Sequence, residues 1–569
     1  MVFFTLVLGA VFFRASYWQV IRGESLSIEA DQQHFFSLDI PATRGEIKTI
    51  DGFPLVANKQ SYVIYANLHE IGGNPKEVAQ KITDILVGDD PSLATDSAEL
   101  AMLGNDMEKK LSLPNATWVR LASGIIETTK EKLLQLNISG LGFYQQSIRD
   151  YPESSMAAQL LGFVSEGKTG VEGNFGLEGY YEEELKGRSG KLLEEKDAFQ
   201  RPILIGDVIK QDKVNGSDLV LTIDRSVQLI VEKHLLQGIA TWKASGGTAI
   251  VMDPKNGNIL AAASFPRYDP KNYYLYQQSL YKDPMVSQLY EPGSIMKPML
   301  MAAAINEGRL TPETRCPVCA GPRVIGSYAV HTFDNHYRPN LTMTEVLINS
   351  DNTGMIFVGE TLGFPKLYEY LKRFGFSQKT GVDLQGEQSE IFRPIDKWYP
   401  IDRATVTFGQ GIAVNSLQMI RGMAVIANGG RLVVPRVVKA IVDSAGQTKE
   451  TKVKQAPQVI SAQAAKIVTE MLVRVTAESE LRWPRDKMPS IKKYRIAAKS
   501  GTAQIPIAGH YDEGRTTGSV LGFGPADNPR FVLLVKLDSP LVRQWGSDTA
   551  GPIFFSIMQD LLNYYNINP

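Results

Sequence analysis

Ser294 and Lys297 are the residues whose types and spacing best suit nucleophilic chemistry. They lie three positions apart, directly after Pro292-Gly293, and open an apolar, alanine-rich stretch that predicts a helix. Side chains three positions apart share one face of a helix, so the lysine amine would lie near the serine hydroxyl. A buried lysine loses part of its preference for charge and can accept a proton from serine. Taken alone, the pair fits equally well a helix cap at Ser294 and a lysine at the surface.

Two later motifs contain groups that could complete such a site. Ser350-Asp351-Asn352 follows an apolar run, and by itself it is typical of a helix cap or a turn. Lys499-Ser500-Gly501-Thr502 follows an apolar run as well, and by itself it fits the end of an ordinary strand. Its lysine and hydroxyls could bind a carboxylate, and glycine in a strand often marks the close approach of a ligand. Together and in this order, the three motifs are the signature of penicillin-recognising serine enzymes.

Strands at both ends of one module are expected to position these motifs. Four apolar runs predict two β-hairpins: Thr248–Met252 with Ile259–Ser264, and Ser519–Phe523 with Phe531–Leu537. Helical patterns lie between them at Met299–Ile305 and Leu417–Ala427, whereas the glycine-rich residues 161–190 predict extended loops. We therefore expect an α/β (α+β) multidomain protein whose last module has a central antiparallel sheet flanked by helices.

Length and composition set wider limits. The chain has 569 residues, which predicts about three or four domains. Apolar residues make up 43% and charged residues 21%, as in globular proteins, and the net charge of −1 gives no basic field for a nucleic acid. Two cysteines and six histidines are few for an enzyme that depends on a histidine-rich metal site.

The N-terminus predicts a membrane anchor at residues 1–22. Val2 to Phe13 contains no charge, and with the residues up to Ile21 it approaches the roughly 20 residues that span a bilayer. Tyr17 and Trp18 suit a membrane–water interface, and no small-residue cleavage site follows. A buried core helix is the alternative. No lysine or arginine precedes the apolar run, so we expect the anchor to be incomplete at its start.

The chain resembles the class B penicillin-binding proteins over nearly its whole length. Beyond the three motifs, the resemblance rests on Thr43-Arg44-Gly45-Glu46-Ile47, Asp51-Gly52, Tyr151-Pro152-Glu153, Gly176-Leu177-Glu178, Leu221-Thr222-Ile223-Asp224, Glu291-Pro292-Gly293-Ser294 and Phe408-Gly409-Gln410-Gly411-Ile412-Ala413-Val414. The N-terminal pattern is more similar to the division type than to the elongation type, although Asp351 stands where the division type usually has serine. The resemblance implies an anchor at 1–22, a non-catalytic pedestal, resembling a dimerisation domain, at 23–220 and a transpeptidase domain, similar to penicillin-binding proteins and serine β-lactamases, at 221–569.

The same resemblance implies a role for each motif residue. Ser294 would attack the D-Ala-D-Ala stem peptide, Lys297 would be the base, and Ser350 would pass a proton to the leaving amine. Asn352 would hold Lys297 and the substrate amide. Lys499, Ser500 and Thr502, with Gly501 between them, would bind the substrate carboxylate. Backbone N–H groups of Ser294 and Thr502 would form the oxyanion hole.

The implied activity is peptidoglycan D,D-transpeptidation for the septal wall, with acylation by β-lactams. No cofactor is required. The implied partners are stem peptides, the membrane, a membrane glycan polymerase and other division proteins, at the outer side of the cytoplasmic membrane. A β-lactam hydrolase or sensor and a non-catalytic scaffold are the alternatives. A hydrolase would need a Glu-x-x-x-Asn loop after Asn352, which we do not find, and no glycosyltransferase motif indicates a bifunctional enzyme.

The two cysteines allow three interpretations. Cys316 and Cys319 are followed by His331 and His336 at a spacing just outside the usual zinc pattern. A redox pair is the second interpretation, but the sequence after Cys319 does not predict the expected helix. An exported protein permits disulfides, so we favour a local disulfide or thiol pair that pins the loop between the first two motifs.

Overall fold

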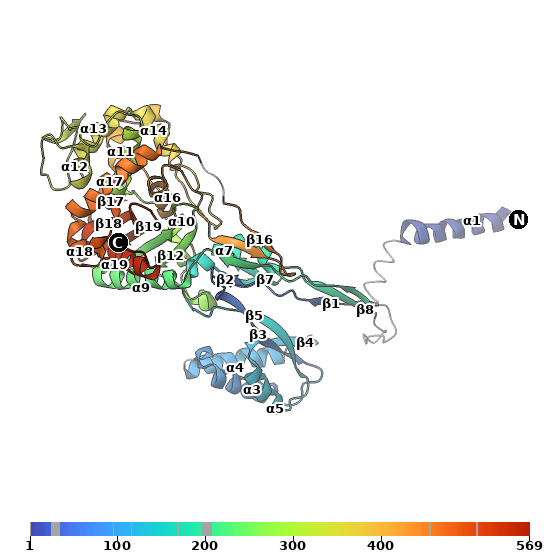
Figure 1. Ribbon diagram of the computed structural model, residues 1–569. Coiled ribbons are helices and arrows are strands. Elements are labelled where there is room, and N and C mark those ends of the chain that lie inside the picture. Colours follow the sequence, from blue (N-terminus) through green and yellow to red (C-terminus); the bar gives the residue numbers. More distant parts are fainter. Residues whose placement is uncertain are drawn as a thin grey trace. The chain divides into compact units, whose positions relative to one another are not determined.

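The computed structural model describes the chain except for short segments; its described residues are 2–23, 35–94, 96–114, 116–167, 170–195, 208–453, 457–507 and 510–569 (Figure 1). They form two compact units. The first contains residues 1–45, 183–218 and 442–447, and the second contains residues 46–182, 219–441 and 448–569.

The first unit contains the N-terminal apolar helix. Helix α1 (Val2–Ser16) continues without interruption into η1 (Tyr17–Ile21). The 20 residues Val2–Ile21 are long and apolar enough to cross a membrane, and none of them is buried. This exposure argues against a buried core helix, because such a helix would have a packed face. The unit also holds an antiparallel sheet of β1 (Phe35–Ile40), β8 (Gly190–Glu195) and β9 (Val208–Gln211).

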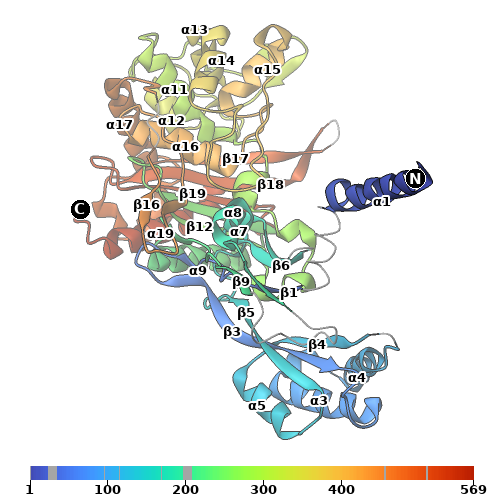
Figure 2. The same cartoon turned by 90° about the vertical axis from the view of Figure 1, so that its right-hand side faces the viewer.

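A separate core lies in the N-terminal part of the second unit, which we call the N-terminal lobe (residues 54–150; Figure 2). Strand β3 (Pro54–Asn67) pairs with both β4 (Trp118–Ile125) and β5 (Leu141–Asp150). Helices α3 (Pro75–Asp89), α4 (Ser97–Leu111) and α5 (Glu127–Gln135) cover one face. On β3, Tyr62, Ile64 and Ala66 face these helices, as the two-residue period of a strand requires.

Strand β3 of the lobe also belongs to a larger sheet, because it pairs with β2 (Ile47–Lys48). The larger sheet has the order β16-β15-β10-β2-β3-β4, with β10 at Asp218–Leu221, β15 at Val438–Val442 and β16 at Thr448–Glu450. The boundary expected at residue 220 therefore falls within β10.

The prediction of extended loops over 161–190 is wrong in part. Strands β6 (Phe163–Gly167) and β7 (Gly170–Asn174) form a hairpin, followed by α7 (Gly176–Tyr180). Phe163 stacks on Tyr273 at a centroid distance of 4.0 Å. This contact between residues distant in the sequence helps to hold the hairpin, and no local pattern predicts it.

Residues 219–441 and 448–569 of the second unit contain the three motifs that the sequence predicts to be catalytic, and we call them the catalytic module. The module is built on a five-stranded sheet with the order β12-β11-β19-β18-β17. Its strands are β11 (Gly246–Met252), β12 (Ile259–Phe265), β17 (Ala497–Ile507), β18 (His510–Gly524) and β19 (Phe531–Asp538). Every neighbouring pair is antiparallel, which confirms both predicted hairpins and the central antiparallel sheet.

Helices cover both faces of this sheet (Figure 2). Helices α9 (Arg225–Trp242) and α19 (Gly546–Tyr564) pack on one face, where Leu533, Val535 and Leu537 of β19 join the core. The other face carries a group of helices that includes α11 (Lys297–Asn306), α12 (Met343–Ile348), α13 (Asn352–Leu362), α14 (Phe364–Arg373), α16 (Ser416–Ala427) and α17 (Ala462–Glu478). The helices predicted at Met299–Ile305 and Leu417–Ala427 are confirmed within α11 and α16.

Candidate active site

Ser294 lies in the turn that leads into helix α11. Residues Gly293–Met296 form a 3-10 turn, and α11 begins at Lys297 with Pro298 in its first turn, where no backbone donor is needed. Gly293 has φ +59°, and a Cβ there would lie 3.0 Å from the carbonyl oxygen of Thr502. Only glycine suits this backbone without strain. The turn that contains Ser294 is thus held directly against the strand that carries the third motif.

A cavity of about 310 Å³ opens above Ser294. Six of the eight residues predicted from the motifs line it: Ser294, Ser350, Asn352, Ser500, Gly501 and Thr502. The other two, Lys297 and Lys499, are 0% and 1% exposed and do not belong to its lining. The cavity brings together segments that are separated by more than 200 positions in the sequence.

Lys297 connects the first motif to the second. Its Nζ donates to the carbonyl oxygen of Ser350 at 2.6 Å and lies 3.3 Å from Ser350 Oγ and 2.8 Å from Asn352 Oδ1. Burial, together with repulsion from Lys499, lowers the pKa of Lys297 well below its usual range, and Asp351 opposes this in part. The neutral amine that a general base requires is therefore favoured.

The second motif divides its roles between capping and chemistry. Asp351 caps α13, because its Oδ1 accepts from Gly354 N and from Thr353 Oγ1, both at 2.7 Å. Ser350 has φ +51°, a strained conformation for serine that is often found at functional sites. The amide of Asn352 is oriented by its donation to the carbonyl oxygen of His331 at 2.9 Å, so its Oδ1 faces Lys297. Asp351 is therefore a helix cap, which is what this motif predicts when it is taken alone. Ser350 and Asn352, on either side of it, contact Lys297 instead.

The third motif lies on β17, as the sequence predicts. A Cβ at Gly501 would lie 3.0 Å from Ile295 Cγ2 and 3.2 Å from Ile295 N, so the glycine lets the turn that contains Ser294 approach the strand. The sequence had indicated close approach by a ligand at that position. Thr502 Oγ1 accepts from Gly546 N at 2.9 Å, which ties β17 to the start of α19.

Lys499 is buried next to Ser500, which lines the cavity. Its Nζ donates to the carbonyl oxygen of Ser500 at 3.0 Å. Burial lowers the pKa of Lys499 to about 8, and the nearby Glu480 carboxylate favours the charged form. Near neutral pH this lysine keeps much of its charge and can attract a carboxylate in the cavity.

The four potential zinc ligands do not form a metal centre. Cys316 and Cys319 are buried and joined by a disulfide, so neither sulfur is a thiolate ligand. His331 Nδ1 instead lies 2.7 Å from the hydroxyl of Tyr337. Within the part of the chain that the structure describes, no group of three or more potential ligands could hold a metal. A Cβ at Gly354 would lie 3.2 Å from Cys319 Sγ, which places the disulfide beside the start of α13.

Several residues at the site lie outside the three motifs. Gly409 belongs to the segment Phe408–Val414, and its carbonyl accepts from Gly293 N at 2.9 Å. Glu291 accepts from Gly411 N at 2.9 Å and from the hydroxyl of Tyr511 at 3.2 Å. The cavity is also lined by Phe333, Glu480, Gln544 and Trp545. The resemblance pointed to Phe408–Val414, but no local pattern points to the other cavity residues.

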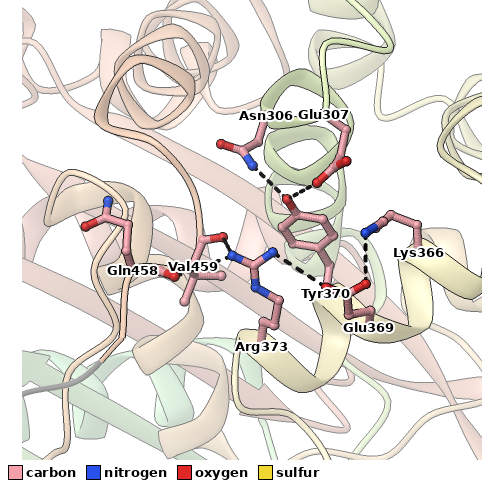
Figure 3. Close-up of polar contacts among 8 residues, drawn as sticks. All are labelled: Asn306, Glu307, Lys366, Glu369, Tyr370, Arg373, Gln458 and Val459. Carbon is pink, nitrogen blue, oxygen red and sulfur yellow. Dashed lines mark hydrogen bonds and ion pairs between the residues drawn. The ribbon is translucent and has the colours of Figure 1, made fainter.

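The far end of α11 is anchored by a polar cluster (Figure 3). The hydroxyl of Tyr370 on α14 donates to Glu307 Oε1 at 2.6 Å and accepts from Asn306 Nδ2 at 2.7 Å. Asn306 Oδ1 in turn accepts from Ser461 N at 2.7 Å. Arg373, one turn along α14, donates to the carbonyl oxygen of Val459. These bonds hold the C-terminal end of α11 in place, and Lys297 is the first residue of the same helix.

The sequence matches two families of penicillin-binding protein domains and several characterised relatives. The penicillin-binding protein transpeptidase domain matches residues 247–559, and the penicillin-binding protein dimerisation domain matches residues 39–221. Stage V sporulation protein D of Bacillus subtilis is 32% identical over 577 residues, which cover 100% of this chain and 86% of that protein. Peptidoglycan D,D-transpeptidase FtsI of Escherichia coli is 27% identical, with 99% of this chain and 91% of that protein covered.

Solved structures agree with these matches. A peptidoglycan synthetase from Bifidobacterium adolescentis has a TM-score of 0.73 at 27% identity, with 94% of this chain and 98% of that chain covered. Penicillin binding protein 3 from Mycobacterium tuberculosis, complexed with aztreonam, has a TM-score of 0.70 at 26% identity and the same two coverages. The likeness therefore extends over nearly the whole chain.

Proposed function

Because the chain belongs to the class B penicillin-binding proteins and is a serine-type peptidoglycan D,D-transpeptidase, we propose that Ser294 is its nucleophile and Lys297 its general base. The observation that supports this most directly is the contact of buried Lys297 with Ser350 and Asn352 beside the Ser294 turn. A lysine deprived of solvent and surrounded by acceptors is suited to take a proton and return it.

The proposed reaction starts with donor binding. The terminal carboxylate of the stem peptide binds Lys499, Ser500 and Thr502. The oxygen of the carbonyl group that Ser294 attacks accepts from the backbone N–H groups of Ser294 and Thr502. Ser294 Oγ attacks the carbonyl carbon while its proton passes to Lys297. The bond to the terminal D-alanine then breaks, and Ser350 passes a proton to the leaving amine. An acceptor amine attacks the acyl-enzyme, which forms the cross-link and releases Ser294.

We propose in addition that β-lactams acylate Ser294. In support, the related penicillin binding protein 3 is described as complexed with aztreonam and with ampicillin. Mass spectrometry should find the whole mass of the β-lactam on Ser294 for minutes or longer, and Ser294→Ala should prevent labelling. Ser490→Ala is the matched control, because Ser490, like Ser165 and Ser279, opens another Ser-x-x-Lys sequence. Label on Ser165, Ser279 or Ser490 would refute the assignment, and rapid release of the label would favour a hydrolase.

The biological role that we propose is synthesis of the septal wall during division. It rests on the division-type pattern of the N-terminal sequence. A role in sporulation is the second candidate, because the relative with 32% identity is named for a sporulation stage. A fluorescent fusion in growing and sporulating cells distinguishes them: signal at the division septum supports the first, and signal confined to sporulating cells supports the second.

We place residues 1–22 in the cytoplasmic membrane, with a pedestal at 23–220 and the transpeptidase domain at 221–569 on the outer side. The exposed apolar helix Val2–Ile21 supports the membrane anchor. The outer side is what the resemblance to the class B penicillin-binding proteins implies. The partners we propose are a membrane glycan polymerase and other division proteins. Purified protein should make no glycan polymer from lipid-linked precursor alone. Polymer formed without a partner would contradict this part of the proposal.

A further inference from the structure

The lining of the active-site cavity contains one charged side chain among the residues that the structure describes. This is Glu480; the other lining residues are glycines, hydroxyl-bearing residues, amides and aromatics. The two lysines of the site are buried and do not contribute to the lining. A substrate that enters therefore meets a carboxylate at the surface, which repels anions and attracts cations.

Glu480 is held in place near the carboxylate-binding end of the cavity. It follows the end of α17, and its Oε2 accepts from Ser547 Oγ on α19 at 3.0 Å. It is also close enough to Lys499 to favour the charged form of that lysine. The carboxylate thus lies on the side of the cavity where, on the proposed function, the terminal D-alanine binds and leaves.

In the second half of transpeptidation, the acceptor arrives at this side of the cavity as a cation. An acceptor stem peptide supplies a primary amine, which is protonated near neutral pH. Its nitrogen must take the place of the D-alanine nitrogen. The same acyl carbon first loses its amide bond to D-alanine and later forms the new amide bond to the acceptor. After D-alanine departs, its space beside Lys499 is open to the incoming acceptor.

We propose that Glu480 is an acceptor-binding residue that draws the ammonium group of the incoming stem peptide into the cavity. The ammonium first loses one proton to water. The neutral amine then attacks the acyl carbon, a C–N bond forms, the bond to Ser294 Oγ breaks, and the second proton goes to Ser294 Oγ. Glu480 takes no proton in this sequence. This inference rests on the proposed assignment of Ser294 and Lys499.

Glu480 could instead serve only as a counter-ion that keeps Lys499 charged. The two roles affect different steps. A counter-ion would act on donor binding and acylation, whereas an acceptor-binding residue acts on how the acyl-enzyme partitions between amine and water. The partition ratio is independent of how fast the acyl-enzyme forms, so it separates the two roles.

The test uses the full chain with a thioester analogue of the donor peptide and D-alaninamide as the acceptor, which has an ammonium group and no carboxylate. Glu480→Gln keeps an acceptor oxygen for Ser547 and removes the charge. We expect the ratio of aminolysis to hydrolysis to fall about fivefold, the scale of one exposed charge pair. Glu480→Lys should lower it further. Added salt should lower the ratio in the natural protein and leave it unchanged in Glu480→Gln.

Glu478→Gln is the matched control, because Glu478 is an exposed carboxylate at the end of α17, two positions before Glu480; it pairs with Arg474 and does not line the cavity. It should change neither acylation nor partition. An unchanged partition ratio in Glu480→Gln, with or without slower acylation, would overturn the proposal. Failure of the natural protein to form any acyl-enzyme on Ser294 would instead refute the proposed function.

Discussion

The N-terminal lobe and the catalytic module bury very different side chains. The lobe has an apolar core with Ile64, Ile82 and Leu133 at its centre, and among the described residues no lysine, arginine, aspartate or glutamate belongs to this core. Its charges pair at the surface, as Lys132 does with Asp89. The catalytic module contains three lysines that are 0–1% exposed: Lys297, Lys499 and Lys536.

This difference shows which core is shaped by packing and which by chemistry. Burying a cation costs free energy unless partners compensate, so a core that served only stability would not need it. Lys536 is compensated by Asp538 Oδ1 at 2.6 Å and Gln288 Oε1 at 3.1 Å, and its Nζ lies over the ring of Tyr290. It thereby anchors the segment that leads to Ser294. Among the described residues, Lys297 has only neutral acceptors within hydrogen-bond distance, an arrangement that favours the free amine.

The largest expected effect is loss of the proposed base. Lys297→Ala should lower the rate of acylation by a β-lactam by roughly 10²–10⁴-fold, the usual contribution of a general base. Folding should be retained, because the change also removes the cost of burying a cation. Stopped-flow acylation and thermal unfolding measure both. Lys366→Ala, which removes an exposed lysine of α14, is the control; acylation by Lys297→Ala at the natural rate would contradict the role.

A substitution in the core of the lobe should lower stability and leave acylation unchanged. Ile82→Ala removes a fully buried side chain and should destabilise the lobe by about 2–5 kcal/mol. Acylation of Ser294, measured per folded molecule, should stay unchanged because no charge or active-site contact is altered. Calorimetry and titration with a fluorescent β-lactam provide the two readings. Slower acylation by folded protein would show that the lobe influences the catalytic module.

A smaller effect is expected from the polar cluster at the C-terminal end of α11. Tyr370→Phe removes one hydroxyl and leaves Asn306 and Glu307 without that partner, so we expect a loss of about 1–3 kcal/mol of stability. Acylation should slow only slightly if the helix keeps its position. Tyr368→Phe on the same helix is the control. A large loss of acylation at unchanged stability would show that the anchor sets the position of Lys297.

The last comparison, between Lys297 and Lys499, is a change of rate with pH and requires no substitution. Lys297 acts in its neutral form, so acylation should rise with pH through its lowered pKa. Lys499 binds a carboxylate in its charged form, so acylation should fall above a pKa of about 8, by about tenfold per pH unit. A donor peptide whose terminal carboxylate is replaced by an amide should lack the alkaline fall. The same fall with both donors would argue against this role of Lys499.

Local patterns in the sequence determined the parts of this site that depend on near neighbours. The spacing of Ser294 and Lys297 predicted one helical face, and the turn residues predicted both hairpins, because turns and helix starts depend on a few adjacent residues. The three motifs in their order predicted the family. The glycine-rich hairpin at 163–174 was missed, because distant aromatic rings stabilise it.

Only the tertiary structure decided the environment of each group. Burial sets the pKa of Lys297 and Lys499, and burial is a property of the packed chain. The approach of Gly501 to Ile295 and the place of Glu480 depend on contacts across hundreds of positions. Spacing left Cys316 and Cys319 open to zinc, redox or disulfide chemistry. The fold brings their sulfurs within bonding distance and uses His331 elsewhere, because ligand geometry depends on where the whole loop lies.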